Sequence, residues 1–215
     1  MKDYISINQA AYDATAPEFQ AKKRLRSENT AALVRELSDY LDLEYPATDI
    51  RVLELGPGSG YAAKLLCDRG YQVTTIEFSE PMARLAQITA PAAELIVDEF
   101  MSHDFKGQKF NAIFAVAFIH LFTRDDAETI VRKMYQLLSS GGIALVSTTQ
   151  HEVSCEGYAE KTNFHAKSVR FRRFYSQEDF IELLSVAPFQ PLKLLQSTDT
   201  EVEGRQWMGY LLKRE

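Results

Sequence analysis

The chain has 215 residues, with 24 Lys or Arg against 30 Asp or Glu, so its formal net charge at pH 7 is −6. With 46% hydrophobic and 25% charged residues, the composition is typical of one globular domain and excludes disordered, collagen-like and disulfide-rich classes. The acidic balance argues against a long nucleic acid as partner, because affinity for a phosphate chain comes mainly from lysine and arginine.

The N-terminal sequence has no basic region followed by an apolar run, and no stretch approaches the roughly 18 apolar residues of a membrane span. We therefore expect a cytoplasmic protein without membrane contact. Cys67 and Cys155 are too few for a disulfide framework, and we expect two free thiols. The His, Asp and Glu residues show no spacing typical of a metal site, so we expect no metal.

Short β-rich segments alternate with longer amphipathic segments along the chain. Two leading helices are predicted over residues 5–25, where a break at Pro17 stays open, and 27–43. The predicted strands cover residues 51–55, 71–77, 93–97, 110–117, 143–149, 189–196 and 206–213, of which the last two form a hairpin. The later helices cover residues 60–69, 80–89, 124–140 and 176–185, with glycines closing the first and third of them.

Strands that alternate with helices pair in parallel through right-handed crossovers. The sequence therefore predicts an α/β fold with three layers, in which a doubly wound, mostly parallel seven-stranded sheet gains one antiparallel strand from the C-terminal hairpin. Ligands of such sheets bind at the carboxyl ends of the strands, next to the first strand.

The turn after the first predicted strand, Gly56-Pro57-Gly58-Ser59-Gly60, leads into a helix. Its glycines let the backbone approach a ligand closely, although a plain strand-to-helix connection is the structural alternative. The next strand ends in Glu77, 23 residues after Glu54, where a carboxylate can accept both hydroxyls of a ribose. The glycine spacing differs from the dinucleotide pattern G-x-G-x-x-G. Glu54 would be buried within the first strand, which is costly unless it meets a cation such as a ligand ammonium group.

The segments LELGPGSG, TTIEFSEPM and FNAIFAVAFIH together resemble the class I S-adenosylmethionine-dependent methyltransferases. The resemblance extends from about residue 12 to the C-terminus and is strongest to small bacterial enzymes that methylate small molecules. It implies a single structural domain, with N-terminal helices over residues 1–45 that cap the cofactor and a Rossmann-like core over residues 46–215. The region 111–120 lacks a D/N-P-P-Y/F motif, which argues against DNA or protein glutamine as substrate.

The resemblance also implies the contacts of S-adenosylmethionine and of its product S-adenosylhomocysteine. Glu54 would hold the methionine part, Glu77 the ribose, and either Asp98 or Glu99 the adenine amino group. The expected cofactor-binding residues are Glu54, Gly56, Pro57, Gly58, Gly60, Glu77, Phe78, Met82, Asp98, Glu99, Phe100, Ala115 and Ala117.

Methyl transfer to a hydroxyl benefits from a general base, and histidine is the commonest choice. His120 follows the fourth predicted strand and His151 the fifth, so both are catalytic candidates together with Tyr12. A structural hydrogen-bonding role is the alternative for each histidine. We expect His103 and His165 at the surface.

Residues 150–175 mix aromatic side chains with arginines, which predicts a lid that recognises an acidic or aromatic acceptor. The alternation in the sequence RFRRF fits a β-strand equally well. The expected substrate-binding residues are Tyr4, Phe118, Tyr158, Arg170, Arg172 and Tyr175.

We therefore expect an enzyme that transfers a methyl group by in-line displacement to an O or N atom of a small molecule, as a monomer or homodimer. An RNA or protein methyltransferase is an alternative, which would bring the basic residues of 22–26 and 170–173 to one rim of the pocket. A further alternative is a protein that binds S-adenosylmethionine without transferring a methyl group.

Overall fold

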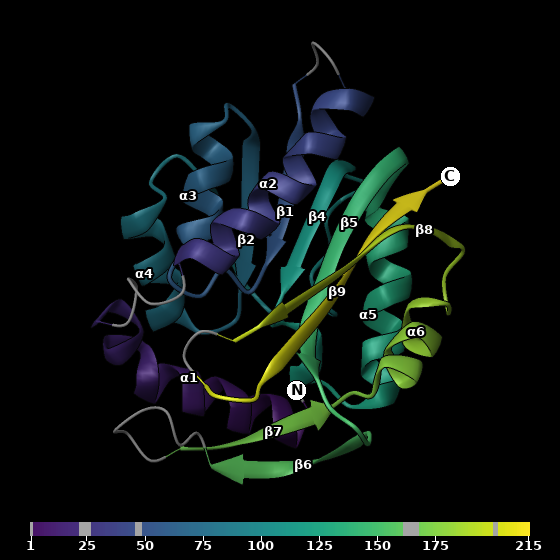
Figure 1. Ribbon diagram of the computed structural model, residues 1–215. Coiled ribbons are helices and arrows are strands. Elements are labelled where there is room, and N and C mark those ends of the chain that lie inside the picture. Colours follow the sequence, from purple (N-terminus) through teal and green to yellow (C-terminus); the bar gives the residue numbers. More distant parts are fainter. Residues whose placement is uncertain (1, 22–26, 46–48, 161–167, 200–201) are drawn as a thin grey trace.

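The computed structural model describes residues 2–21, 27–45, 49–160, 168–199 and 202–215 (Figure 1). Its main sheet has seven strands in the order β3-β2-β1-β4-β5-β9-β8. The strands are β1 (Arg51–Leu55), β2 (Gln72–Glu77), β3 (Glu94–Val97), β4 (Phe110–Val116), β5 (Leu138–Gln150), β8 (Phe189–Thr198) and β9 (Gln206–Arg214). Strands β1 to β5 pair in parallel, whereas β9 is antiparallel to both of its neighbours. The predicted fold class is confirmed.

Helices cover both faces of this sheet. The helices are α1 (Asp3–Ala21), α2 (Ser27–Glu44), α3 (Tyr61–Asp68), α4 (Glu80–Thr89), α5 (Arg124–Leu137) and α6 (Gln177–Leu184), with a short 3-10 turn η1 (Ile119–Leu121) after β4. Side chains alternate along each strand, so Leu53 and Leu55 pack with α5 and α6 while Val52 packs with α2 and α3. No helix among the described residues is long and apolar enough to cross a bilayer.

The structure departs from the sequence prediction at the end of the fifth helix and at Pro17. The helix expected over 124–140 ends at Leu137, because Leu138 already pairs with Phe110 as the first residue of β5. Pairing with the sheet therefore overrides the helical pattern in the last three residues. The first helix continues through Pro17 to Ala21, so the break at Pro17 is not adopted, and residues 22–26 lie outside the described part.

The segment predicted as a lid contains a separate two-stranded hairpin of β6 (Cys155–Glu160) and β7 (Val169–Phe174). Phe171 of β7 is buried in the core, as the strand alternative predicts. Its backbone N–H donates to Asn8 Oδ1 at 2.7 Å, and Asn8 also donates to the carbonyl of Leu121. Strand β7 therefore lies beside α1 (Figure 1).

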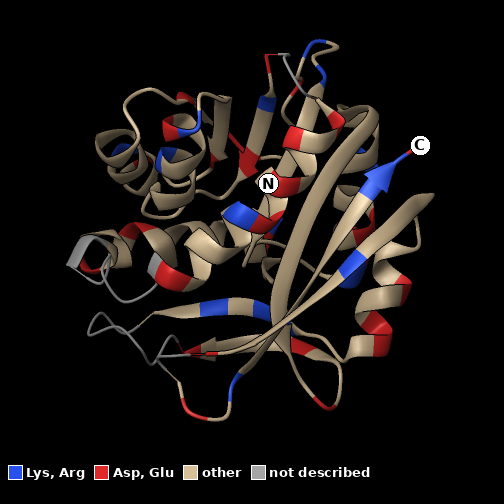
Figure 2. Ribbon diagram, turned by 45° about the horizontal axis from the view of Figure 1, so that its top comes forward, with Lys and Arg blue, Asp and Glu red and all other residues tan. Residues whose placement is uncertain are grey.

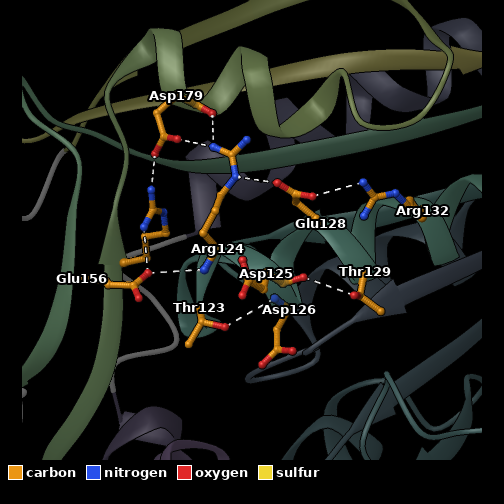
Figure 3. Close-up of polar contacts among 10 residues, drawn as sticks. Thr123, Arg124, Asp125, Asp126, Glu128, Thr129, Arg132, Glu156 and Asp179 are labelled. Carbon is orange, nitrogen blue, oxygen red and sulfur yellow. Dashed lines mark hydrogen bonds and ion pairs between the residues drawn. The ribbon is translucent and has the colours of Figure 1, made fainter.

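A network of ion pairs fixes the hairpin on α5 and α6. Arg173 of β7 pairs with Glu156 of β6 and with Asp179 of α6, each at 2.7 Å. Arg124, at the start of α5, pairs with the same Asp179 and with Glu128 (Figure 3). Because Arg173 and Asp179 are both largely shielded from solvent, these pairs orient β7 more firmly than exposed pairs would.

The turn between β1 and α3 requires glycine at position 60. Gly60 has φ of +78°, and a Cβ atom there would lie 2.6 Å from the carbonyl oxygen of Ala86 in α4.

We expect Gly60→Ala to lower the free energy of unfolding by about 3 kcal/mol, from backbone strain and overpacking. Gly70→Ala is the matched control, because Gly70 also has positive φ but open space around it; about 1 kcal/mol is expected. Urea denaturation of both variants measures the difference, and equal losses would contradict the close packing at Ala86.

Candidate active site

The carboxyl ends of the parallel strands open onto a cavity of about 590 Å³, a volume typical of ligand sites. Helices α1 and α2 and strands β7, β8 and β9 complete its wall. The predicted site residues that line it are Tyr12, Glu54, Gly56, Pro57, Gly58, Glu77, Phe78, Met82, Asp98, Glu99, Phe100, Ala117, Phe118, His120, Arg170 and Arg172. The predicted site residues outside its described lining are Tyr4, Gly60, Ala115, His151, Tyr158 and Tyr175.

Glu54 places a carboxyl group in the cavity wall without a cation beside it. The residue is 4% exposed, and its Oε2 atom has no hydrogen-bond partner among the described residues. Burial raises the pKa of Glu54 to about 8, and the charge of Glu77 adds to the shift. A buried carboxyl oxygen without a donor fits a ligand that brings an ammonium group to this point.

The turn after β1 leaves room for a ligand beside Gly58 but not beside Gly60. A Cβ atom on Gly58 would meet no atom within 4 Å, so the backbone here borders the open cavity. Gly60 lies behind the turn against Ala86. The expectation that Gly60 touches the cofactor therefore gives way to a packing role between α3 and α4.

Glu77 ends β2 with a second buried carboxyl group. Its Oε1 atom accepts a hydrogen bond from the backbone N–H of Ser79 at 2.9 Å. Burial raises the pKa of Glu77 to about 7, although the backbone amides of Ser79 and Phe78 oppose the shift. The carboxyl group therefore faces the cavity from the carboxyl end of a strand next to β1, where it can accept hydrogen bonds from ligand hydroxyls.

Two acids follow β3 and border the cavity together. Asp98 accepts from His103 Nδ1 at 2.8 Å, and this hydrogen bond lowers the pKa of Asp98. The two oxygens of Glu99 accept from the backbone amides of Met101 and Ser102 at 2.8 and 2.9 Å. Both acids line the cavity, so either carboxylate can accept a hydrogen bond from an exocyclic amine.

The end of β4 turns its backbone toward the cavity. Ala117 has φ of +55°, and its N–H donates to the carbonyl of Ser147 at 2.9 Å. The next residue, Phe118, lies against Gly56 and is buried. His120 follows in η1, is 4% exposed and lines the cavity. An aromatic side chain and an imidazole thus border the cavity at the end of the fourth strand.

Helix α1 lines the cavity, and side-chain hydrogen bonds connect it to the β2–α4 turn and to strand β7. Gln9 donates to the carbonyl of Phe78 at 2.8 Å, and Ser79 donates to Asp13 at 2.5 Å. On the other side, Arg170 of β7 donates to the hydroxyl of Tyr12 at 2.9 Å. The predicted catalytic candidate Tyr12 is thus held in the cavity wall between the β2–α4 turn and the hairpin.

His151 lies next to the cavity wall and outside its described lining. Its Nε2 atom is 3.0 Å from the hydroxyl oxygen of Thr149, which lines the cavity. Burial lowers the pKa of His151, and the charges of Arg172 and Arg205 add to the shift. The imidazole is therefore neutral at pH 7 and positions Thr149 rather than reaching the cavity itself.

Three tyrosines expected at the substrate have other surroundings. Tyr4 is buried and donates to Asp126 at the start of α5. Tyr175 is fully buried beside Phe180 of α6. Tyr158 is 55% exposed on β6. Tyr4 and Tyr175 are thus anchors of the core.

Several cavity residues were not predicted from the sequence. They are Asn8 of α1, Thr149 of β5, and Arg205 and Trp207 near the start of β9. Trp207 is the single tryptophan of the chain, which is a signal for a ligand site that the sequence analysis did not use. His165 and the basic residues of 22–26 lie outside the described residues. In the described part of the chain, no group of three or more His, Cys, Asp or Glu side chains is placed to hold a metal ion.

The chain is similar to known proteins in sequence and in fold. A family model described as "Methyltransferase domain" matches residues 52–142. The chain is 26% identical over 186 residues to malonyl-[acyl-carrier protein] O-methyltransferase of Priestia megaterium, covering 80% of this chain and 67% of the relative. The Bacillus cereus protein of the same name is 26% identical over 165 residues, covering 72% and 60%. The chain thus spans 67% of the length of the first relative and 60% of the length of the second.

A solved structure extends the likeness to nearly the whole chain. The 1,6-didemethyltoxoflavin-N1-methyltransferase of Burkholderia thailandensis, with bound 1,6-didemethyltoxoflavin and S-adenosylhomocysteine, matches with a TM-score of 0.78 at 17% identity, covering 99% of this chain and 89% of that one. Residues 52–142 thus match a methyltransferase domain, and nearly the whole chain shares the fold of this S-adenosylhomocysteine-bound structure. In the described part of the chain, the unpartnered oxygen of Glu54, the open backbone at Gly58 and the carboxyl group of Glu77 fit the ammonium, carboxylate and ribose groups of such a ligand.

The raised pKa of Glu54 makes the binding of an ammonium ligand at this carboxyl group depend on pH. Below about pH 8 the carboxyl group is mostly neutral, so an ammonium ligand must bind the minor ionised form. We expect the affinity for S-adenosylhomocysteine to rise about 50-fold between about pH 6 and pH 8, as the ionised fraction of Glu54 rises from about 1% to about 50%. Calorimetric titration across this range measures the rise.

Glu54→Gln is the control variant, because it cannot ionise and is expected to bind weakly with little dependence on pH. The folded-state pKa of Glu54 lies above its ordinary value, so its contribution to stability is lost as the pH rises through about 8. We therefore expect the variant to unfold at a higher temperature than the wild type at about pH 8.5. A wild type whose affinity is constant with pH would contradict the role of Glu54.

Proposed function

We propose that this protein transfers a methyl group from S-adenosylmethionine to an O or N atom of a small-molecule acceptor. The observation that supports the proposal is the pair of buried carboxyl groups, Glu54 and Glu77, at the carboxyl ends of neighbouring strands and within one cavity. The cavity continues past them to α1, β7 and β9, which leaves a second region for an acceptor. When bound, S-adenosylmethionine supplies a methyl group on a positively charged sulfur.

The residues of the cavity divide between the two ligands in this proposal. Glu54 holds the ammonium group, Glu77 accepts from the ribose hydroxyls, and Phe78 and Met82 pack against the adenine. Asp98 or Glu99 accepts from the adenine amine. Phe118 and Tyr12 exclude water from the region where the acceptor meets the methyl group, since a water-free and aligned approach lowers the barrier of an in-line displacement. Helix α1 contacts α4 and β7, helix α2 contacts α3 and β5, and both helices line the cavity, where we propose that they cap the bound cofactor.

His120 is the side chain that we propose as general base. It is buried, lines the cavity and follows β4 directly. Neutral imidazole can accept the proton that a hydroxyl acceptor loses as its oxygen bonds to the methyl carbon. For this step His120 needs only to reach the acceptor oxygen, because no covalent intermediate with the protein is required.

The names of similar proteins are compatible with a small acceptor group. The Burkholderia protein is named for an N-methylation of a small heterocycle, and the two bacterial relatives are named for an O-methylation of a malonyl group on a carrier protein. Arg170 and Arg172 face the cavity interior, whereas Arg173 pairs with acids outside the cavity lining. The basic residues of 170–173 therefore do not form one rim. A cytoplasmic location and a monomeric or homodimeric state stay predictions.

Calorimetry with Glu77→Ala tests the cofactor site. We expect the wild type to bind S-adenosylmethionine and S-adenosylhomocysteine in the micromolar range and not to bind NAD, and the variant to lose at least about 100-fold in affinity, since a hydrogen-bonded charge is removed. Glu94→Ala is the matched control, because Glu94 is an exposed carboxylate on the neighbouring strand that accepts from Thr74. Full affinity in a folded Glu77→Ala protein would overturn the assignment.

A His120→Gln variant tests the general base once an acceptor is identified by screening with a labelled methyl group. For a hydroxyl acceptor we expect kcat to fall about 100-fold or more, because general-base catalysis contributes at least this factor. The affinity for S-adenosylhomocysteine should not change. The acidic limb of the kcat profile against pH should also disappear, and an unchanged kcat would show that His120 has a structural role only.

A further inference from the structure

Arginines gather at the acceptor end of the cavity. Arg170 and Arg172 lie two positions apart on β7, so their side chains share one face of the strand and both line the cavity. Arg205, which precedes β9, lines it as well. Figure 2 shows basic residues on the ribbon of β7 beside α1. The cavity therefore has buried acids on the β1 and β2 side and arginines on the β7 and β9 side.

The three arginines of the cavity differ in whether a carboxylate of the described residues pairs with them. Arg205 pairs with Asp199 at 3.5 Å. Arg170 donates only to the neutral hydroxyl of Tyr12, and Arg172 donates through Nη2 to the neutral hydroxyl of Thr149 at 2.6 Å. No carboxylate of the described residues pairs with either of these two arginines.

Arg172 is the arginine of this pair with a buried nitrogen, Nε, that lacks an acceptor in the described structure. Burial lowers the pKa of Arg172 to about 10, and the charges of Arg170 and Arg205 add to the shift. A buried guanidinium without a counter-charge is expensive.

Arg173, which follows Arg172 in β7, has the carboxylate partners that Arg172 lacks among the described residues. It faces the opposite side, where Glu156 and Asp179 each pair with it at 2.7 Å. The face of β7 that is turned to the core and helices is thus neutralised, while the face turned to the cavity is not. Since the cavity face is the one that a ligand can reach, a ligand is the natural source of the missing negative charge.

We propose that the methyl acceptor carries a carboxylate group, which Arg172 and Arg170 bind in the cavity. This inference rests on the proposed function, because it names the acceptor that the same cavity takes. The planar guanidinium fork matches the two oxygens of a carboxylate. Arg172 is already oriented by Thr149 and by the ring of Phe174, whose centroid lies 4.7 Å from its guanidinium carbon, so little side-chain entropy is lost on binding. Phe118 and Trp207 line the same cavity and give the rest of the acceptor apolar surroundings.

Binding of simple carboxylates and of their uncharged amides tests this assignment. The probe pairs are acetate with acetamide, malonate with malonamide and benzoate with benzamide, titrated by calorimetry into the full-length protein with and without saturating S-adenosylhomocysteine. We expect at least one carboxylate to bind the wild type about tenfold or more tightly than its amide, since hydrogen bonds to a charged group are strong. Arg172→Met should remove this preference while the affinity for S-adenosylhomocysteine stays within about twofold.

Arg173→Met is the matched control at the adjacent position of β7. We expect it to keep the carboxylate preference and to unfold at a lower temperature, because it leaves Asp179 and Glu156 without their partner. Without ligand, Arg172→Met should unfold at a higher temperature than the wild type, since it removes an unneutralised buried charge. A structural role of Arg172 predicts the opposite shift.

Three results decide between the proposals. If none of the carboxylates is preferred over its amide, or if the preference survives in Arg172→Met, the carboxylate site is overturned. If S-adenosylhomocysteine fails to bind the wild type while the carboxylate preference and its loss in Arg172→Met are observed, the cofactor assignment fails and the carboxylate site stands. If S-adenosylhomocysteine binds and Arg172→Met loses the preference, both are supported.

Discussion

The cost of burying charge without a partner is the constraint on which this cavity depends. Glu54 and Glu77 lie at the ends of two central strands, and burial raises the pKa of both. Across the cavity Arg172 is partly buried, with a buried Nε atom and without a carboxylate partner in the described structure, and burial lowers its pKa. Within the described residues, no ion pair joins the two sets of groups. The free protein thus keeps acidic groups and arginines apart in one cavity, and ligands that bring an ammonium group to the acids and a carboxylate to the arginines relieve both penalties.

The sequence predicted the cofactor end of the site because local rules determine it. A strand, a glycine turn and a helix follow one another within residues 51–68, and parallel pairing then brings the end of β2 beside the end of β1. Glu54, Gly58 and Glu77 therefore reached the cavity as expected. Ala115 did not, because alternation along β4 turns its side chain into the core. Ala117 does line the cavity, since its left-handed backbone changes the direction of the chain after β4.

The acceptor end could not be predicted in the same way, because contacts between distant segments determine it. The pattern RFRRF shows that β7 alternates, but the ion pairs of Arg173 with Glu156 and Asp179 decide which face is turned to the cavity. The sequence predicted an antiparallel strand over 206–213, but not the register against β5 that places Trp207 opposite Thr149, with Arg205 just before the strand, in the cavity wall. Tyr4 was expected at the substrate, whereas its hydroxyl donates to Asp126 of α5.

The separation of the two ends also bears on how such a cavity can evolve. The groups assigned to the cofactor come from β1, β2, β4 and the turns that follow them, whereas the arginines come from a hairpin that lies outside the main sheet and from the edge of β9. Exchanging the sequence of β6 and β7 would alter the acceptor region without moving a strand of the main sheet. Selection can therefore change the acceptor by altering the hairpin while the methyl donor stays the same, and the same division offers a place to graft new specificity by protein engineering.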